Sequence, residues 1–181
     1  AGKDAALYAP AIAMIHMAFN GSNIGQVLPF AEKLPVGARV QLMAVLAGYP
    51  AEAVLPAVVK AAGGESAPAV RMEALRTIGK IGNPSVVAML ARRAVVTAGE
   101  EQALARETLA RLKGSDVEAA ILEELKKETD DKVKAELVEA AAERRIAAAK
   151  PILMELARSS EPTVRLRSIR ALAEIATPAD L

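Results

Sequence analysis

The chain has 181 residues, of which 52% are apolar, 25% are charged and only 2% are aromatic. Lysine and arginine number 23 and aspartate and glutamate 22, so the formal net charge of +1 supplies no global field that would attract nucleic acid or an anionic membrane. Cysteine and tryptophan are absent, which excludes disulfides, thiolate metal sites and base stacking on indole rings. The core must therefore be built from Ala, Leu, Val and Ile side chains.

Residues 1–34 predict an atypical pair of helices. One helix is expected over 4–19, with a kink at Pro10, and a second over 23–33. The apolar run in the first helix is too short to cross a bilayer, so no membrane span is expected. Because a terminal repeat covers an otherwise open core, such a pair is typical of a cap, and a degenerate repeat fits the sequence equally well.

A regular repeat begins near residue 35. One position recurs early in the first helix of each unit, at intervals of 32, 34, 29 and 31 residues: Ala38, Val70, Leu104, Val133 and Val164. We predict four to five repeats over 35–181, the last of them truncated, in one continuous domain. A helical hairpin of this size cannot bury its apolar face alone, so neighbouring hairpins must stack to complete the core.

The clearest unit runs over residues 66–99. Gly79 and Gly82 end its first helix, Asn83 is placed to cap the next helix, and Gly99 is expected to end that helix. Second helices are expected over 51–62, 84–98, 116–128 and 146–158. The pattern predicts an all-α fold, an α–α superhelix or solenoid of stacked helical hairpins with about eleven helices.

These motifs resemble the HEAT repeat family in its short, phycobilisome-lyase-like form. Pro68-Ala69-Val70-Arg71 and Glu161-Pro162-Thr163-Val164-Arg165 are similar to the turn that opens the first helix in that family. Gly79-Lys80-Ile81-Gly82-Asn83 is similar to the segment that joins the first helix of a repeat to the second in that family. The unit that begins at Glu100 departs from the pattern, with Ala105 where the arginine of the opening turn would lie.

The resemblance implies a right-handed superhelix whose second helices line a concave face that holds another protein or domain. It also implies that Arg71 and Arg165 are structural ladder residues, each reaching the acidic opening or the carbonyl ends of the preceding unit. A looser similarity to HEAT segments of large exported bacterial proteins favours a periplasmic or exported location, with the cytoplasm as the alternative.

Charged residues on the predicted second helices are the candidate partner-binding side chains. They are Arg92, Arg93, Lys126, Lys127, Glu155 and Arg158. If these helices line a groove, the six side chains should be exposed and without intramolecular charge partners, so that they form a mixed-charge surface for a protein. A solvated helix face would show the same pattern without any partner.

The sequence does not predict an enzyme. His16 lies between Met14 and Met17, but the chain has no second histidine and no cysteine that would complete a soft-metal site or serve as a nucleophile. A HEAT-like DNA glycosylase is the remote alternative, and the resemblance to that family would require tryptophans around a carboxylate on a basic face. We therefore expect a monomeric, non-catalytic scaffold that binds a protein or a flanking domain of the same chain, without metal, cofactor or nucleic acid. A purely architectural spacer in a larger protein is the alternative.

Overall fold

The computed structural model describes residues 8, 10, 12, 14–64 and 67–176. Helices and connecting turns make up this part of the chain, and no β-strand occurs in it. The predicted all-α class is confirmed. Two compact units are present, Ala1–Gly82 and Asn83–Leu181, while the expectation of one continuous domain remains a prediction.

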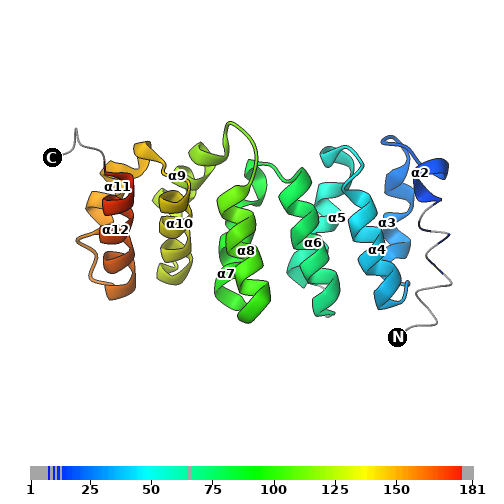
Figure 1. Cartoon of the computed structure of the whole chain (residues 1–181), viewed down its shortest axis with the longest axis horizontal. Coiled ribbons are helices and arrows are strands. Elements are labelled where there is room, and N and C mark those ends of the chain that lie inside the picture. The colour runs from blue at the N-terminus through cyan, green and yellow to red at the C-terminus, as the bar shows by residue number, and fades with distance from the viewer. Residues whose placement is uncertain (1–7, 9, 11, 13, 65–66, 177–181) are drawn as a thin grey trace. The chain divides into compact units, whose positions relative to one another are not determined.

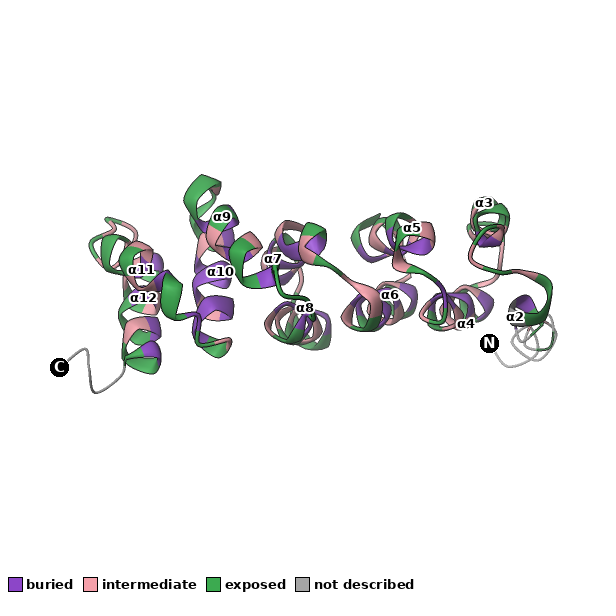
Figure 2. Ribbon diagram, turned by 90° about the horizontal axis from the view of Figure 1, so that it is seen from above, coloured by how far each residue is buried: buried purple, intermediate pink, exposed green. Residues whose placement is uncertain are grey.

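The first unit contains two first helices, α4 (Val36–Leu46) and α6 (Pro68–Ile81), and the second helix α5 (Ala51–Gly64). Because α6 packs against both α4 and α5, these helices form two layers (Figures 1 and 2). The shorter elements that precede them are α2 (Ile15–Ala18), the 3₁₀ turn η1 (Ile24–Gln26) and α3 (Leu28–Ala31).

The second helix of the predicted N-terminal pair is shorter and more broken than its apolar pattern suggests, because only the turns η1 and α3 occur where a helix was expected over 23–33. For the helix expected over 4–19, residues 8, 10, 12 and 15–18 are helical, and its other residues before 14 lie outside the described ranges. Side chains compete for the backbone here: Asn20 Oδ1 accepts from the Ser22 N–H at 2.9 Å, and Asn23 Oδ1 accepts from the Asn20 N–H at 2.6 Å. Such local bonds offer the backbone an alternative to helix at the start of the second predicted element.

The second unit repeats a simple pairing of helices. Three helix pairs follow one another in it: α7 (Val87–Val96) with α8 (Gly99–Arg111), α9 (Val117–Lys127) with α10 (Asp131–Glu143), and α11 (Lys150–Leu156) with α12 (Pro162–Ile175). The 3₁₀ turns η2 (Pro84–Val86) and η3 (Ala147–Ala149) lead into α7 and α11. The first helices α8, α10 and α12 form one layer and the second helices α7, α9 and α11 the other, with buried residues where the layers meet (Figure 2).

Local sequence explains where these helices begin. The Asn83 side chain accepts from the Ser85 N–H, Asp130 Oδ1 accepts from the N–H groups of Lys132 and Val133, and Glu161 accepts from the Thr163 N–H. Each bond satisfies an amide that has no partner within the first turn of its helix. The predicted second helices are confirmed to within a few residues at each end.

Gly99 has a different role from the predicted one. The helix α7 ends at Val96, and Gly99 is instead the first residue of α8. Its φ of +60° lies in the left-handed region, which lets the chain reverse between the two helices.

The repeat register of the third unit also differs from the predicted alignment. The buried position equivalent to Ala38, Val70, Val133 and Val164 is Glu101 and not Leu104, which is only half-buried. The intervals then become 32, 31, 32 and 31 residues, more regular than the sequence alignment indicated. Because the core position of this unit holds the carboxylate of Glu101, a hydropathy pattern does not identify it. The sequence alignment therefore placed Leu104 at that position.

The end of α10 forms a Schellman motif around an arginine. The Ile146 N–H donates to the Ala141 carbonyl at 3.0 Å, and the Arg145 N–H donates to the Ala142 carbonyl at 2.8 Å. This geometry needs a left-handed residue, and Arg145 takes it with φ of 51°. Glycine normally fills this position, because a Cβ atom is strained there.

Candidate functional site

A polar arrangement in the second unit, the Glu136 cluster, consists of Arg106, Glu136 and Arg167 on three successive first helices. Arg106 donates from Nε to Glu136 Oε2 at 2.6 Å and from Nη2 to Oε1 at 2.7 Å. From the other side, Arg167 Nη1 donates to Glu136 Oε1 and to the Ala135 carbonyl, both at 3.0 Å. The cluster therefore connects α8, α10 and α12 through one buried carboxylate.

The pKa of Glu136 reflects this arrangement. Burial alone would raise the pKa of the carboxyl, but the hydrogen bonds and positive charges of Arg106 and Arg167 outweigh it and hold the pKa below its ordinary value. Glu143, the last residue of α10, shows the opposite shift. Burial, together with the negative charges of Glu139 and Glu174, raises its pKa.

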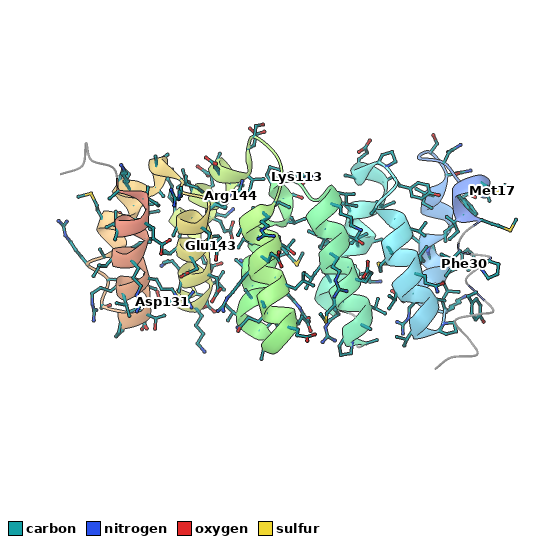
Figure 3. All side chains as sticks on the ribbon, in the orientation of Figure 1. Met17, Phe30, Lys113, Asp131, Glu143 and Arg144 are labelled. Atoms are coloured by element: carbon teal, nitrogen blue, oxygen red, sulfur yellow. The ribbon has the colours of Figure 1, made fainter. Side chains whose placement is uncertain are left out.

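Two further contacts join residues about one repeat apart in the chain. Arg144, labelled in Figure 3, follows α10. Its Nη1 donates to the carbonyls of Ala110 and Leu112, at the end of α8, at 2.7 and 2.9 Å. In the first unit, buried Thr77 donates to the Met43 carbonyl at 2.8 Å, near the end of α4. Both contacts satisfy carbonyls in the last turn of a helix, which would otherwise lack a partner.

The predicted ladder arginines lie at the start of their helices. Arg165 Nη1 donates to the carbonyls of Ser159 and Ser160 at 2.8 and 3.3 Å, in the turn that follows α11. This contact is of the kind expected, because those carbonyls end the preceding unit. Arg71 occupies the equivalent position in α6 and is half-buried.

Sequence reasoning missed the residues of the Glu136 cluster and Arg144. The signal that could have found them is spacing: Arg106 and Glu136 are 30 residues apart, Glu136 and Arg167 are 31 apart, and Arg144 lies 32 and 34 residues beyond its two carbonyls. Opposite charges separated by one repeat on equivalent helices are brought together by stacking. A search for short motifs does not compare residues that lie one repeat apart, so it does not find these pairs.

Among the candidate partner-binding residues, Arg93 is corrected by the structure. Its side chain is only 13% exposed, and its Nε donates to Glu101 Oε1 at 2.9 Å. The expectation of an exposed, unpaired charge is wrong here because Glu101 occupies a core position of α8 and needs a cation beside it. Arg93 thus stabilises the α7–α8 packing.

Arg92 is exposed but is also paired. Its Nη2 lies 3.2 Å from Glu128 Oε2 and 3.7 Å from Glu124 Oε1, so it connects α7 with the end of α9. Glu128 accepts in addition from the N–H groups of Asp130 and Thr129, and these bonds, with the Arg92 charge, lower its pKa against the effect of burial. The expectation that Arg92 lacks an intramolecular charge partner is therefore wrong as well.

The remaining four candidates differ in their surroundings. Lys127 Nζ lies 2.8 Å from Glu124, and Lys126 Nζ lies 3.7 Å from Glu123, so both lysines have acidic neighbours on their own helix α9. The expectation of unpaired charges fails for these two, although both stay exposed. Glu155 and Arg158, at the end of α11, are exposed, and within the described residues neither forms an ion pair.

The charged side chains described above can form hydrogen bonds and ion pairs with a partner. Among the described residues, no group of three or more His, Asp or Glu side chains could hold a metal ion. The His16 side chain lies outside the described part of the structure. No helix in the described ranges is both long enough and apolar enough to traverse a bilayer.

The repeat pattern and its contacts agree with comparisons to known proteins. The model of the HEAT repeats family matches residues 31–110 and 118–181, which is most of the chain. The chain therefore belongs to the HEAT repeat family, whose members are generally protein-interaction scaffolds and typically non-catalytic. A search of the curated proteins found no match.

Proposed function

We propose that the chain is a non-catalytic scaffold that holds a protein, or another domain of the same polypeptide, on the outer face of α12. The observation that supports this proposal is an exposed apolar stripe on that helix. Leu166 is 50% exposed and Ile169 is 51% exposed, and both lie on one helix face at a spacing of three residues. Large apolar side chains grouped in this way mark interaction surfaces more often than singly scattered ones.

The repeat register supports the interpretation of this stripe as a stacking face. Ile169 is equivalent to Met43 in α4 and Val138 in α10, which are 4% and 0% exposed. In those units the next first helix packs over the face: α6 packs against α4, and α12 packs against α10. Because a helix covers the equivalent face of α4 and of α10, the exposed face of α12 also has a shape that fits a helix. We therefore propose that the partner presents an amphipathic helix.

Charged second-helix residues contribute to the proposed surface at its margin. Glu155 and Arg158 follow exposed Met154 on α11, and α11 packs against α12. Their unpaired charges would tune the rate and selectivity of association more than its strength. Arg92, Lys126 and Lys127 are proposed only as secondary contributors, because each already has an acidic neighbour.

Site-specific photo-crosslinking in the native host tests this proposal. A benzophenone side chain at Leu166 should crosslink to one discrete protein, or to another domain of the same polypeptide, and Ile169→Lys should abolish the product. The same probe at Val96, a 70% exposed apolar residue on α7, is the matched control. If neither position gives a discrete product, the architectural spacer is the better description.

A further inference from the structure

The exposed face of α12 is apolar beyond its two large side chains. Ala173, one turn after Ile169, is also exposed and lies on the same side of the helix. In α10, which packs against α12 (Figure 1), the equivalents of Leu166, Ile169 and Ala173 are all buried. These equivalents are Ala135, Val138 and Ala142. A helix that docks on α12 as α12 docks on α10 therefore covers three apolar positions.

A polar side chain accompanies this packing at the edge of the face. Where α12 lies on α10, Arg167 Nη1 donates to the Ala135 carbonyl and to Glu136 Oε1, both at 3.0 Å. Glu136 is contacted from both neighbouring first helices, since Arg106 of α8 also donates to it. In α12 the equivalent of Glu136 is Arg167, so the charge at this edge is reversed. A helix that docks on α12 meets a cation where α12 itself meets a carboxylate.

The positive charge of α12 exceeds the negative charge paired with it. Arg165 donates to backbone carbonyls, and Arg167 shares the carboxylate of Glu136 with Arg106. Arg170 is exposed, and in the described part of the chain it forms neither an ion pair nor a side-chain hydrogen bond. It lies four residues after Leu166, so the two side chains are neighbours on the helix surface. An unpaired cation thus borders the apolar face.

The acidic residue of α12, Glu174, does not neutralise this cation. Its negative charge is among the causes that raise the pKa of Glu143 on α10, so its carboxylate lies toward α10. Within the described residues no ion pair joins Glu174 to Arg170, although the two are four residues apart. Arg170 is therefore available to a partner.

The stacking of α10 and α12 indicates which charge fits. The helix α10 contains four acidic residues and two lysines, whereas α12 contains three arginines and one glutamate. An acidic first helix thus packs against a basic one. Complementary charge on the exposed side of α12 requires another acidic helix, because like charges that face each other oppose association.

We propose that the partner helix on α12 is acidic. Its apolar side covers Leu166, Ile169 and Ala173, and its carboxylates pair with Arg170 and with the exposed part of Arg167. This inference rests on the proposed function and specifies the chemistry of the partner. A second copy of α12 does not fit this face, since it would place arginine against arginine. The apolar contacts supply most of the affinity, and the arginines select the partner.

Binding of two stapled helical peptides to the full chain tests the acidic preference. The peptides share one face of leucine and alanine and differ only at two flanking positions, which hold glutamate in one peptide and lysine in the other. By fluorescence anisotropy at low salt, we expect the glutamate peptide to bind about three- to tenfold more tightly, because exposed ion pairs replace like-charge contacts. At about 1 M salt, where the Debye length is about 3 Å, the difference should disappear.

Variants of the chain separate charge selection from apolar binding. Arg170→Glu should reverse the preference, so that the lysine peptide binds more tightly, and Arg170→Gln should reduce it. Arg76→Glu, at the equivalent position of α6 in the first unit, is the matched control and should change neither affinity. Ile169→Lys should weaken both peptides by at least about tenfold, the loss expected when one isoleucine is no longer buried. Thermal melts check that each variant stays folded.

Three results would overturn the proposal: binding of neither peptide, equal binding of both, or an unreversed preference in Arg170→Glu. The crosslink at Leu166 tests the proposed function separately, so a discrete crosslink without charge preference retains the binding face and rejects the acidic helix. Self-association in analytical ultracentrifugation that Ile169→Lys abolishes would identify a second copy as the occupant, and it would also overturn the proposal.

Discussion

Arg106 and Glu136 form a two-pronged ion pair between helices one repeat apart in the sequence, with N–O distances of 2.6 and 2.7 Å. The same carboxylate also accepts from Arg167 on the following first helix. One glutamate thus fixes the spacing of three consecutive first helices in the second unit. Directional bonds of this kind specify register in a way that interchangeable apolar contacts between Ala, Leu and Val do not.

Glu136→Gln should lower the free energy of unfolding by about 2 kcal/mol, because two arginines lose the charge of a buried hydrogen-bond partner. The half-buried Arg106 can recover part of its solvation, which keeps the loss below that of a fully buried pair. Urea denaturation followed by circular dichroism measures this loss. Glu155→Gln, at an exposed residue without an ion pair, is the control and should change stability by less than about 0.5 kcal/mol.

The acid limb of the stability curve should depend on Glu136. Its folded pKa lies below the ordinary value of 4.5, so the unfolded state binds the proton more tightly. The stabilisation from Glu136 is therefore complete above the ordinary pKa and is lost as the pH falls through the folded pKa. Glu136→Gln should flatten the loss of stability below pH 4.5, and an unchanged slope would contradict the assigned contacts.

Glu143 should behave in the opposite sense. Its folded pKa is raised, so its ionised form opposes folding at neutral pH, and this cost disappears as the pH falls through the raised pKa. Glu143→Gln should make the protein slightly more stable at pH 7, and the difference from the original chain should vanish in acid. Thermal melts across this pH range would detect the convergence.

Arg93 and Glu101 should show strong coupling in a double-mutant cycle. Arg93→Met leaves a carboxylate at a core position and should cost about 3 kcal/mol, and Glu101→Val should also destabilise by stranding the half-buried guanidinium. Glu101→Val restores the residue type of the other repeats, so the double variant should lie within about 1 kcal/mol of the original chain. Additive losses would show that the two side chains act independently.

Arg145→Gly should raise stability by about 0.5–1 kcal/mol, because glycine takes the left-handed conformation without the strain of a Cβ atom. The bonds of Ile146 and Arg145 to the end of α10 involve only backbone atoms and would persist. Arg158→Gly is the matched control, since Arg158 does not have a positive φ, and it should leave stability unchanged or lower it. Differential scanning calorimetry resolves shifts of this size.

Much of the helical framework could be predicted from the sequence, because the relevant signals are local. Asn83, Asp130 and Glu161 cap amides two or three residues away, at the starts of η2, α10 and α12. The second helix at 84–98, which Asn83 was expected to cap, was accordingly placed to within a few residues. The register of the third unit could not be predicted, because Glu101 is charged at a position where the other units have Ala or Val.

The sequence by itself determined the all-α class, the repeat of about 32 residues and the family, since each rests on periodicity along the chain. Only the tertiary structure decided which charges face solvent. Arg93 and Arg158 look alike as basic residues near the end of a second helix. Arg93 is half-buried and paired with Glu101, whereas Arg158 is exposed and forms no ion pair within the described residues. Stacking decides this difference, because it brings together residues from neighbouring helices whose pairing leaves no periodic trace in the sequence.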